Sequence, residues 1–152
     1  MKNNKNEISR RNFLGTIGTA AVGLTIVPGN VLGKSFGSVA PSDKLNIAGI
    51  GVGGMGRNNL RNMSTENIVA LCDVDWGYAA KTFKDYPKAK QFKDWRVMFD
   101  EFGSSIDAIM VATPDHSHAA VTAHAITLGK HAYTQKPLTH SVYESRLLTK
   151  LA

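Results

Sequence analysis

A run of closely spaced glycines directly after a short apolar segment limits the fold of this chain more than any other feature. Residues 44–50 form an apolar segment of strand length, and Gly51, Gly53 and Gly56 follow with the spacing G-x-G-x-x-G. In this pattern the first glycine allows a tight turn, the second lets a pyrophosphate approach the backbone, and the third packs a helix on a strand. Gly49 allows the same spacing in a second register. The pattern predicts a strand, a turn and a helix whose first N–H groups face a phosphate.

The rest of the chain alternates short apolar runs with longer amphipathic stretches, which is typical of β-α-β units around a parallel sheet. We expect strands at residues 44–50, 67–72, 90–92, 107–112 and 130–134. We expect helices at residues 54–63, 76–83, 95–102, 117–128 and from 141 to the C-terminal end. The prediction is an α/β fold with a doubly wound parallel sheet, the Rossmann fold, over residues 44–152. No Gly or Pro stops the last helix, so we expect this domain to be incomplete at its C-terminal end.

A carboxylate suited to a dinucleotide follows the second expected strand. Asp73 comes about 20 residues after the glycines, where it can accept hydrogen bonds from an adenosine ribose. By itself Asp73 would also suit a turn or a helix cap, and Asp75 could share the ribose or cap the helix near Trp76. Because the glycines precede Asp73 at the right distance, we favour dinucleotide binding. Its negative charge would repel the extra phosphate of NADP, so we expect NAD rather than NADP.

The formal net charge of +6 lies mostly in the first forty residues, which carry five basic residues against Glu7 alone, a net charge of +4. The remaining residues are nearly neutral, so a nucleic-acid partner is not expected. Arg10 and Arg11 stand just before an apolar run rich in Gly, Ala and Thr at residues 15–27. This order resembles a twin-arginine export signal, although a basic tail before an ordinary buried helix is the alternative.

The apolar run after the paired arginines has about 13 residues, and a membrane-spanning helix needs about 20. A permanent membrane span is therefore not expected. We expect residues 1–40 to be a signal peptide and linker, and the protein to be periplasmic or otherwise extracytoplasmic.

Cysteine and histidine give no metal or disulfide signature. Cys72, the single cysteine, ends an apolar run, so we expect a buried thiol and no internal disulfide. His116, His118 and His124 have none of the His-Glu-x-x-His or Cys/His spacings of metal sites. We expect no metal.

Two further expected strands end in polar residues at the sheet edge where open α/β proteins place their ligands. The first is followed by the segment Thr113-Pro114-Asp115-His116-Ser117-His118 and the second by Gln135-Lys136-Pro137-Leu138. With the glycine run and the segments ALCDVD and KDW, they resemble the Gfo/Idh/MocA oxidoreductases, named for glucose-fructose oxidoreductase and inositol dehydrogenase. The resemblance covers the chain from about residue 44 to its end.

The resemblance implies a Rossmann domain that binds NAD or NADP, and a second α/β domain, missing from this chain, that acts on sugars, polyols or related hydroxyl compounds. It implies a small carbohydrate-like substrate and, for the full-length protein, a homo-oligomer. It also implies that the cofactor is held by Gly51, Gly53, Gly54, Met55, Gly56, Asp73, Thr113, Pro114, His118, Gln135, Lys136 and Pro137.

Lys136 is the catalytic residue that the resemblance implies. Its ammonium could hold the substrate oxygen and ease the loss of a proton during hydride transfer to the nicotinamide. Pro137 disfavours helical backbone at Lys136 and so helps to aim its side chain. The family's usual glutamate is replaced by Gln135, so one negative charge beside the lysine is missing. Without this context, Lys136 would be an ordinary solvated lysine.

Three functions stay open at this point. The first is an NAD(P)-dependent oxidoreductase that acts on a sugar, polyol or related hydroxyl compound. The second is an NAD-dependent glycosidase that works by transient oxidation and elimination, and the third is a non-catalytic nucleotide-binding module. We expect the chain alone to bind NAD weakly and to oxidise nothing, because substrate-binding groups would come from the missing domain.

Overall fold

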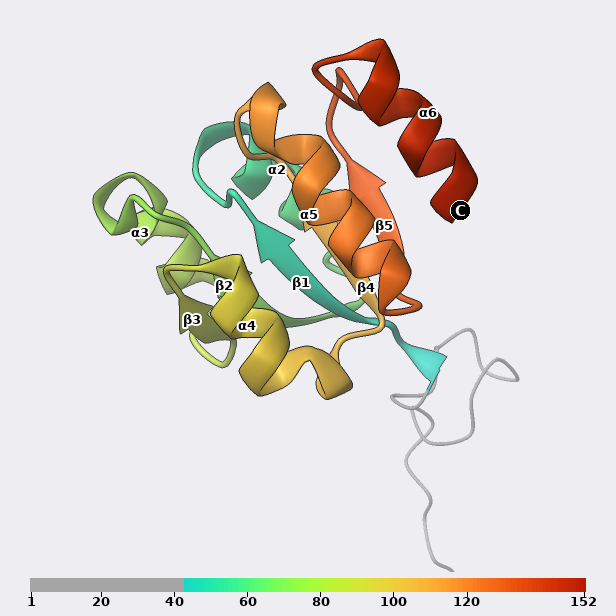
Figure 1. The fold of residues 1–152 in the computed structure, drawn as a ribbon. Coiled ribbons are helices and arrows are strands. Elements are labelled where there is room, and N and C mark those ends of the chain that lie inside the picture. The colour runs from blue at the N-terminus through green and yellow to red at the C-terminus, as the bar shows by residue number, and fades with distance from the viewer. Residues whose placement is uncertain (1–42) are drawn as a thin grey trace, which may run out of the picture. The chain divides into compact units, whose positions relative to one another are not determined.

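The computed structural model describes residues 43–152, in which helices cover both faces of a parallel sheet (Figure 1). The strands are β1 (Asn46–Ile50), β2 (Asn67–Cys72), β3 (Lys90–Phe92), β4 (Ala108–Val111) and β5 (His131–Thr134). The helices are α2 (Gly54–Asn62), α3 (Trp76–Asp85), α4 (Trp95–Phe102), α5 (Asp115–Thr127) and α6 (Val142–Leu151), with a 3₁₀ turn at Gly103–Ser105. Every strand and helix expected for these residues is confirmed, and the ends differ by at most two residues.

The sheet has the strand order β3-β2-β1-β4-β5, and all neighbouring strands are parallel. The chain therefore runs from β1 through β2 to the edge strand β3, and then crosses back to β4, on the other side of β1. The connections that leave β1 and β4 diverge, which opens a crevice at the carboxyl ends of these strands. This order confirms the doubly wound Rossmann fold.

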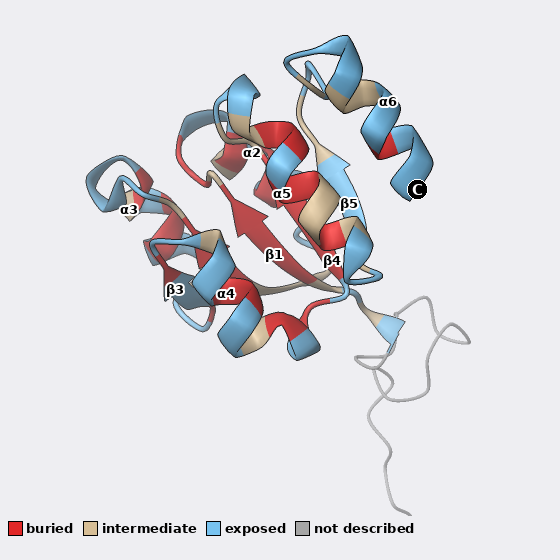
Figure 2. Ribbon diagram, in the orientation of Figure 1, coloured by how far each residue is buried: buried red, intermediate tan, exposed pale blue. Residues whose placement is uncertain are grey.

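Two apolar layers hold the helices on the sheet, because successive strand side chains point to opposite faces. On one face the buried residues of β1, β2 and β4 pack against α4 and α5, among them Ile50, Ile109, Met98, Phe99 and Val121. On the other face they pack against α2 and α3, among them Leu71, Met110, Leu60, Ala79 and Phe83. The central strands are buried along most of their length (Figure 2).

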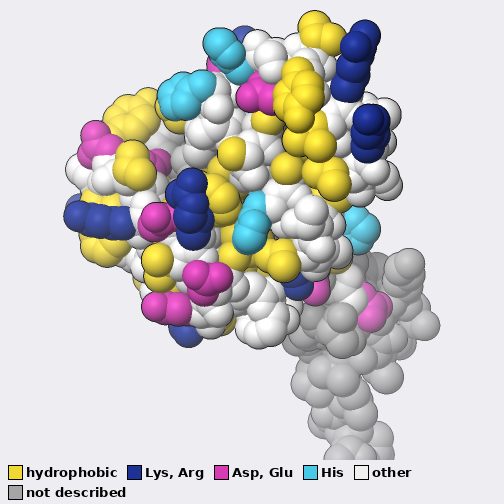
Figure 3. Space-filling view, viewed as in Figure 1, with side chains coloured by type: hydrophobic (Ala, Val, Ile, Leu, Met, Phe, Trp, Pro, Cys, Tyr) yellow, Lys and Arg dark blue, Asp and Glu magenta, His cyan; other side chains and the backbone are white. Residues whose placement is uncertain are grey.

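The edge strand β5 is different, because three of its four residues are exposed. Hydrophobic side chains gather on this side of the molecule (Figure 3). Those of the segment after β5 and of α6 include the exposed residues Leu138, Val142, Tyr143, Leu147 and Leu151.

Within residues 43–152, no helix combines the length and the apolar character needed to cross a bilayer. The expected export signal, residues 1–40, lies outside the described residues.

Candidate functional site

The glycine loop, residues 51–56, follows the carboxyl end of β1. It packs too tightly for any side chain at Gly51 and Gly56, the first and third glycines of the motif. Gly51 has φ +75°, and a Cβ there would lie 2.6 Å from the Thr113 nitrogen. A Cβ on Gly56 would overlap the carbonyl oxygen of Gly51. Since Gly49 lies inside β1, the register that begins at Gly51 is the one that forms the turn from strand to helix.

The Asp73 carboxylate joins the end of β2 to the glycine loop. Its Oδ2 accepts hydrogen bonds from the backbone N–H groups of Val52 (2.8 Å) and Gly53 (3.1 Å). Its Oδ1 accepts one from the N–H of Asp75 (2.9 Å). A carboxylate oxygen can accept two hydrogen bonds, so Oδ1 keeps an acceptor position for a ribose hydroxyl. Asp75 caps the helix α3, which is one of the two roles considered for it, because its Oδ1 accepts a hydrogen bond from the Tyr78 N–H.

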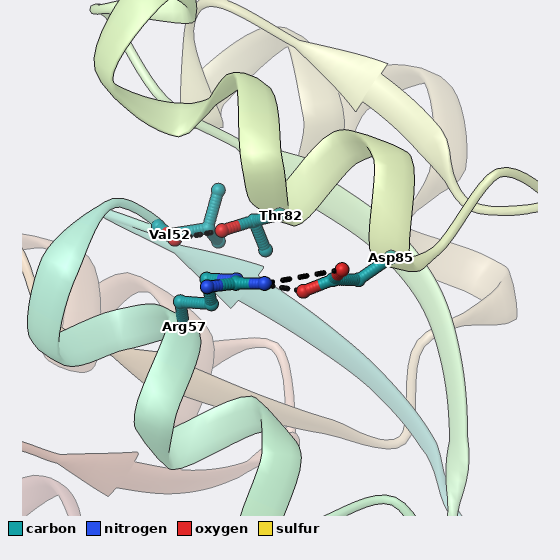
Figure 4. Close-up of polar contacts among 4 residues, drawn as sticks. All are labelled: Val52, Arg57, Thr82 and Asp85. Carbon is teal, nitrogen blue, oxygen red and sulfur yellow. Dashed lines mark hydrogen bonds and ion pairs between the residues drawn. The ribbon is translucent and has the colours of Figure 1, made fainter.

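Two polar contacts fix α3 against the loop and α2 (Figure 4). The buried Thr82 hydroxyl donates to the carbonyl oxygen of Val52 at 2.6 Å. Arg57 donates to both carboxylate oxygens of Asp85, at 2.7 and 3.2 Å. The hydrogen bonding raises the pKa of Arg57 and holds the pKa of Asp85 below its usual value. As a result the loop, α2 and α3 are held as one unit.

A cleft of about 580 Å³ opens at the carboxyl ends of β1, β2 and β4. Its lining includes Gly51, Gly53, Met55, Asp73, Thr113 and Pro114. The Thr113 Oγ1 is buried and has no hydrogen-bond partner within residues 43–152. A buried hydroxyl without a partner costs about 1–3 kcal/mol. A polar ligand atom in the cleft would remove that cost.

These features fit an adenosine diphosphate group. The helix α2 has no side-chain cap and no acidic residue in its first turn, and in the glycine loop the Asp73 carboxylate bonds only to Val52 and Gly53, which precede the helix. The helix N–H groups suit the diphosphate, the Asp73 carboxylate suits the ribose, and the cleft has room for the base. The residues present therefore suit a dinucleotide coenzyme.

The remaining predicted site residues form a second group at the ends of β4 and β5. His118 is buried, and its ring nitrogens lie 2.7 Å from the Pro137 carbonyl oxygen and 2.8 Å from that of Thr113. Gln135 donates through Nε2 to the Oδ1 of Asn59 on α2 at 3.1 Å. Its Oε1 accepts from the Lys136 N–H at 3.0 Å. These contacts connect the second group to helix α2 and to the turn after β4.

Lys136 itself is exposed, and it is not among the residues that line the 580 Å³ cleft. The peptide bond between Lys136 and Pro137 is cis. The structure thus places the predicted residues in two connected groups. The glycine loop, Asp73, Thr113 and Pro114 surround the cleft, while His118, Gln135, Lys136 and Pro137 lie at the corner beside it.

Tyr78 also lines the cleft, and no sequence motif predicted it as a site residue. Its only sequence signal is its place five residues after Asp73, in the first turn of the helix that returns to the loop. Cys72 also lines the cleft, but burial raises the pKa of its thiol to about 12, and Asp73 and Asp94 add to the effect. A reactive thiolate is therefore not available there.

No cluster of three or more His, Cys, Asp or Glu side chains able to hold a metal ion occurs among the described residues.

Comparison with known proteins gives consistent results. Residues 45–152 match the model of the oxidoreductase family with an NAD-binding Rossmann fold, GFO_IDH_MocA. A glycosyl hydrolase family 109 protein from Shewanella pealeana is 27% identical over 161 residues, which cover 91% of this chain and 35% of that protein. This chain thus spans about a third of the length of the curated relatives that it matches along most of its length.

Two solved structures share the fold. The myo-inositol 2-dehydrogenase from Lactobacillus plantarum has a TM-score of 0.64 and 24% identity, over 71% of this chain and 32% of that one. The WlbA dehydrogenase from Bordetella pertussis, in complex with NADH and UDP-GlcNAcA, has a TM-score of 0.63 and 19% identity, over 71% and 33% of the two chains.

Proposed function

The chain belongs to the Gfo/Idh/MocA oxidoreductase family, and we propose that it supplies the NAD-binding part of an enzyme that oxidises a hydroxyl group of a sugar, polyol or related compound. One observation carries the proposal: the glycine loop, the Asp73 carboxylate and the unpartnered Thr113 hydroxyl line one cleft. Bound NAD supplies the hydride acceptor, and the protein supplies binding, orientation and proton transfer.

Coenzyme choice depends on Asp73. Three backbone N–H groups hold its carboxylate in one orientation, which leaves Oδ1 able to accept from a ribose hydroxyl. A fixed negative charge at this position disfavours the additional phosphate of NADP. The coenzyme proposed is therefore NAD.

Proton transfer is assigned to Lys136. It follows β5 at the same sheet edge as the glycine loop, and the bonds of Gln135 to Asn59 and of Pro137 to His118 hold its backbone on both sides. Its ammonium can donate to a substrate oxygen and, once deprotonated, accept the hydroxyl proton as hydride leaves the carbon. Substrate contacts and a second acid or base are proposed to come from a further domain.

The experiment that tests the coenzyme proposal is calorimetry on the ligand-free chain with NAD and with NADP. We expect NAD to bind more tightly than NADP. Asp73→Asn raises the Kd for NAD about tenfold, because a charged acceptor for the ribose and for the loop amides is weakened. Asp100→Asn, which removes an exposed carboxylate on α4, is the matched control and leaves the Kd unchanged. Absence of heat with both coenzymes would disprove the proposal.

A second function is favoured by the similarity to the glycosyl hydrolase family 109 protein, which extends over 91% of the chain. In that function the same hydride transfer is transient and is followed by elimination of the glycosidic oxygen. Product analysis with a glycoside separates the two functions. Only the second releases an aglycone with no net change in the redox state of the coenzyme, and Lys136→Ala should abolish either reaction in the complete polypeptide.

We further propose that residues 1–40 direct export by the twin-arginine route, a proposal supported by Arg10 and Arg11 and by the apolar run after them. Replacing both arginines with lysine should retain the protein in the cytoplasm, as measured by cell fractionation. Unchanged export of the substituted protein would contradict the proposal.

A further inference from the structure

Tyr78 covers the glycine loop from the side of α3. A Cβ on Gly53 would overlap atoms of the Tyr78 ring, and a Cβ on Gly54 would overlap its hydroxyl oxygen. The side-chain space at both glycines is therefore taken by an aromatic residue of the protein itself. Tyr78 thus lies on the part of the loop where the sequence pattern predicts a pyrophosphate.

The backbone of Tyr78 is held firmly. Its N–H donates to the capping carboxylate of Asp75 at 2.9 Å. One turn later, Thr82 bonds to the carbonyl oxygen of Val52, and Arg57 pairs with Asp85 at the end of the helix (Figure 4). Because Thr82 and Asp85 tie the C-terminal half of α3 to the loop and to α2, the position of Tyr78 over the loop follows from the packing of the helix.

Despite this support, the Tyr78 side chain is 67% exposed and lines the cleft. Met55 and Val74, at 59% and 84% exposed, lie on the same lining. Large apolar side chains that stay exposed around a concave site are typical of ligand-binding surfaces. The ring is therefore placed to contact a ligand rather than to fill the core.

The hydroxyl of Tyr78 makes no hydrogen bond with any residue of 43–152, and it lies beside the first residue of α2. An anion bound at this helix end would receive backbone N–H donors and could also accept from a phenol O–H. The unpartnered Oγ1 of Thr113 on the lining of the same cleft is an independent sign that a polar ligand belongs there.

We propose that Tyr78 is a coenzyme-binding residue, whose hydroxyl donates to the diphosphate and whose ring forms the wall of the cleft beside the glycine loop. This assignment rests on the proposed function and adds to the glycine motif a binding group from the next helix. Gly54 has a left-handed backbone (φ +46°) that itself favours glycine, and a side chain there would also displace the phenol.

The test compares Tyr78→Phe, which keeps the ring and removes the hydroxyl, with the unsubstituted chain. Calorimetry with NAD, ADP and adenosine is the measurement. We expect the Kd values for NAD and ADP to rise about ten- to a hundredfold, as for the loss of one hydrogen bond to a charged group. The Kd for adenosine, which has no phosphate, stays unchanged. Tyr143→Phe, on an exposed tyrosine of α6, is the control and changes none of them.

Tyr78→Ala removes the wall as well and weakens binding of all three ligands, adenosine included. Circular dichroism and thermal unfolding establish that each variant is folded. Equal NAD affinity in Tyr78→Phe, or tighter binding in Tyr78→Ala, would overturn the assignment while leaving the proposed function in place. If the unsubstituted chain bound neither NAD nor ADP, the proposed function would fail, and the assignment with it.

Discussion

The cleft beside the glycine loop and the corner at the end of β5 differ in how completely the described residues hold them. At the cleft, three hydrogen bonds to Asp73 and the contacts of Thr82 and Arg57 bind the loop, β2, α2 and α3 together. At the corner, His118, Gln135 and Thr134, which bonds to Thr122, contact the rest of the domain, while Lys136 and most of β5 are exposed.

Under the proposed function, coenzyme binding and proton transfer depend on separate parts of the molecule. The cleft contains, within this chain, the donors and acceptors that an adenosine diphosphate requires. The corner holds the backbone around Lys136 but leaves this residue exposed to solvent. Water around the reacting groups disfavours the hydride transfer that Lys136 is proposed to assist. Changes at the cleft should therefore act on coenzyme affinity, and changes at the corner should act on Lys136 with little effect on affinity.

The largest effect is expected from Gly56→Ala, which acts on the cleft. Its Cβ would overlap the carbonyl oxygen of Gly51, a backbone atom that cannot move without opening the turn. We expect the free energy of unfolding to fall by about 2–4 kcal/mol and NAD binding to be lost. Denaturant unfolding and calorimetry measure the two quantities.

The control for this prediction is Gly103→Ala. Gly103 is also buried, but it has helical backbone angles, and its Cβ would meet Phe99 at an ordinary distance of 3.7 Å. This variant should keep both its stability and its NAD affinity. If the two alanine variants behaved alike, the tight packing at Gly56 would not be the cause.

His118→Asn should have a smaller effect, and it should act on the corner only. An asparagine cannot reach both the Thr113 and Pro137 carbonyl oxygens, so the two turns separate. We expect a loss of about 1–3 kcal/mol in the free energy of unfolding and faster amide hydrogen exchange in residues 135–141. The Kd for NAD should change by less than about twofold, since the bonds of Asp73 to the glycine loop remain.

The matched control is His131→Asn, on an exposed histidine of the edge strand, which should leave exchange in residues 135–141 unchanged. A large loss of NAD affinity in His118→Asn would show that the cleft and the corner are not separable. Unchanged exchange in that variant would show that His118 does not hold the segment around Lys136.

The fold could be predicted almost completely. The strands β1, β2 and β4 are covered on both sheet faces, so their sequences are short, nearly continuous apolar runs. The turn at Gly51 and the acidic residue at the end of β2 also follow from their spacing along the chain. The contacts that complete the site do not. Gln135 bonds to Asn59 from 76 positions away. Nothing in the local pattern shows that Tyr78 lies over Gly53, because that contact depends on the angle at which α3 returns to the loop.

The smallest effect is expected at the contact between α2 and α3, where Arg57 pairs with Asp85. The pair is exposed to solvent, so salt screens it and its contribution to stability is small. Because the folded-state pKa of Asp85 lies below its unfolded value, the pair stabilises the fold above the unfolded pKa. That stabilisation is lost as the pH falls through the lowered folded-state pKa.

Asp85→Asn should therefore lower the Tm slightly at neutral pH and low salt, and the difference should vanish in strong acid or high salt. Tm measurements across pH and salt check this. A difference that persisted in strong acid would mean that Asp85 acts through packing rather than charge, and α3 would then be held over the loop by Thr82 without help from the ion pair.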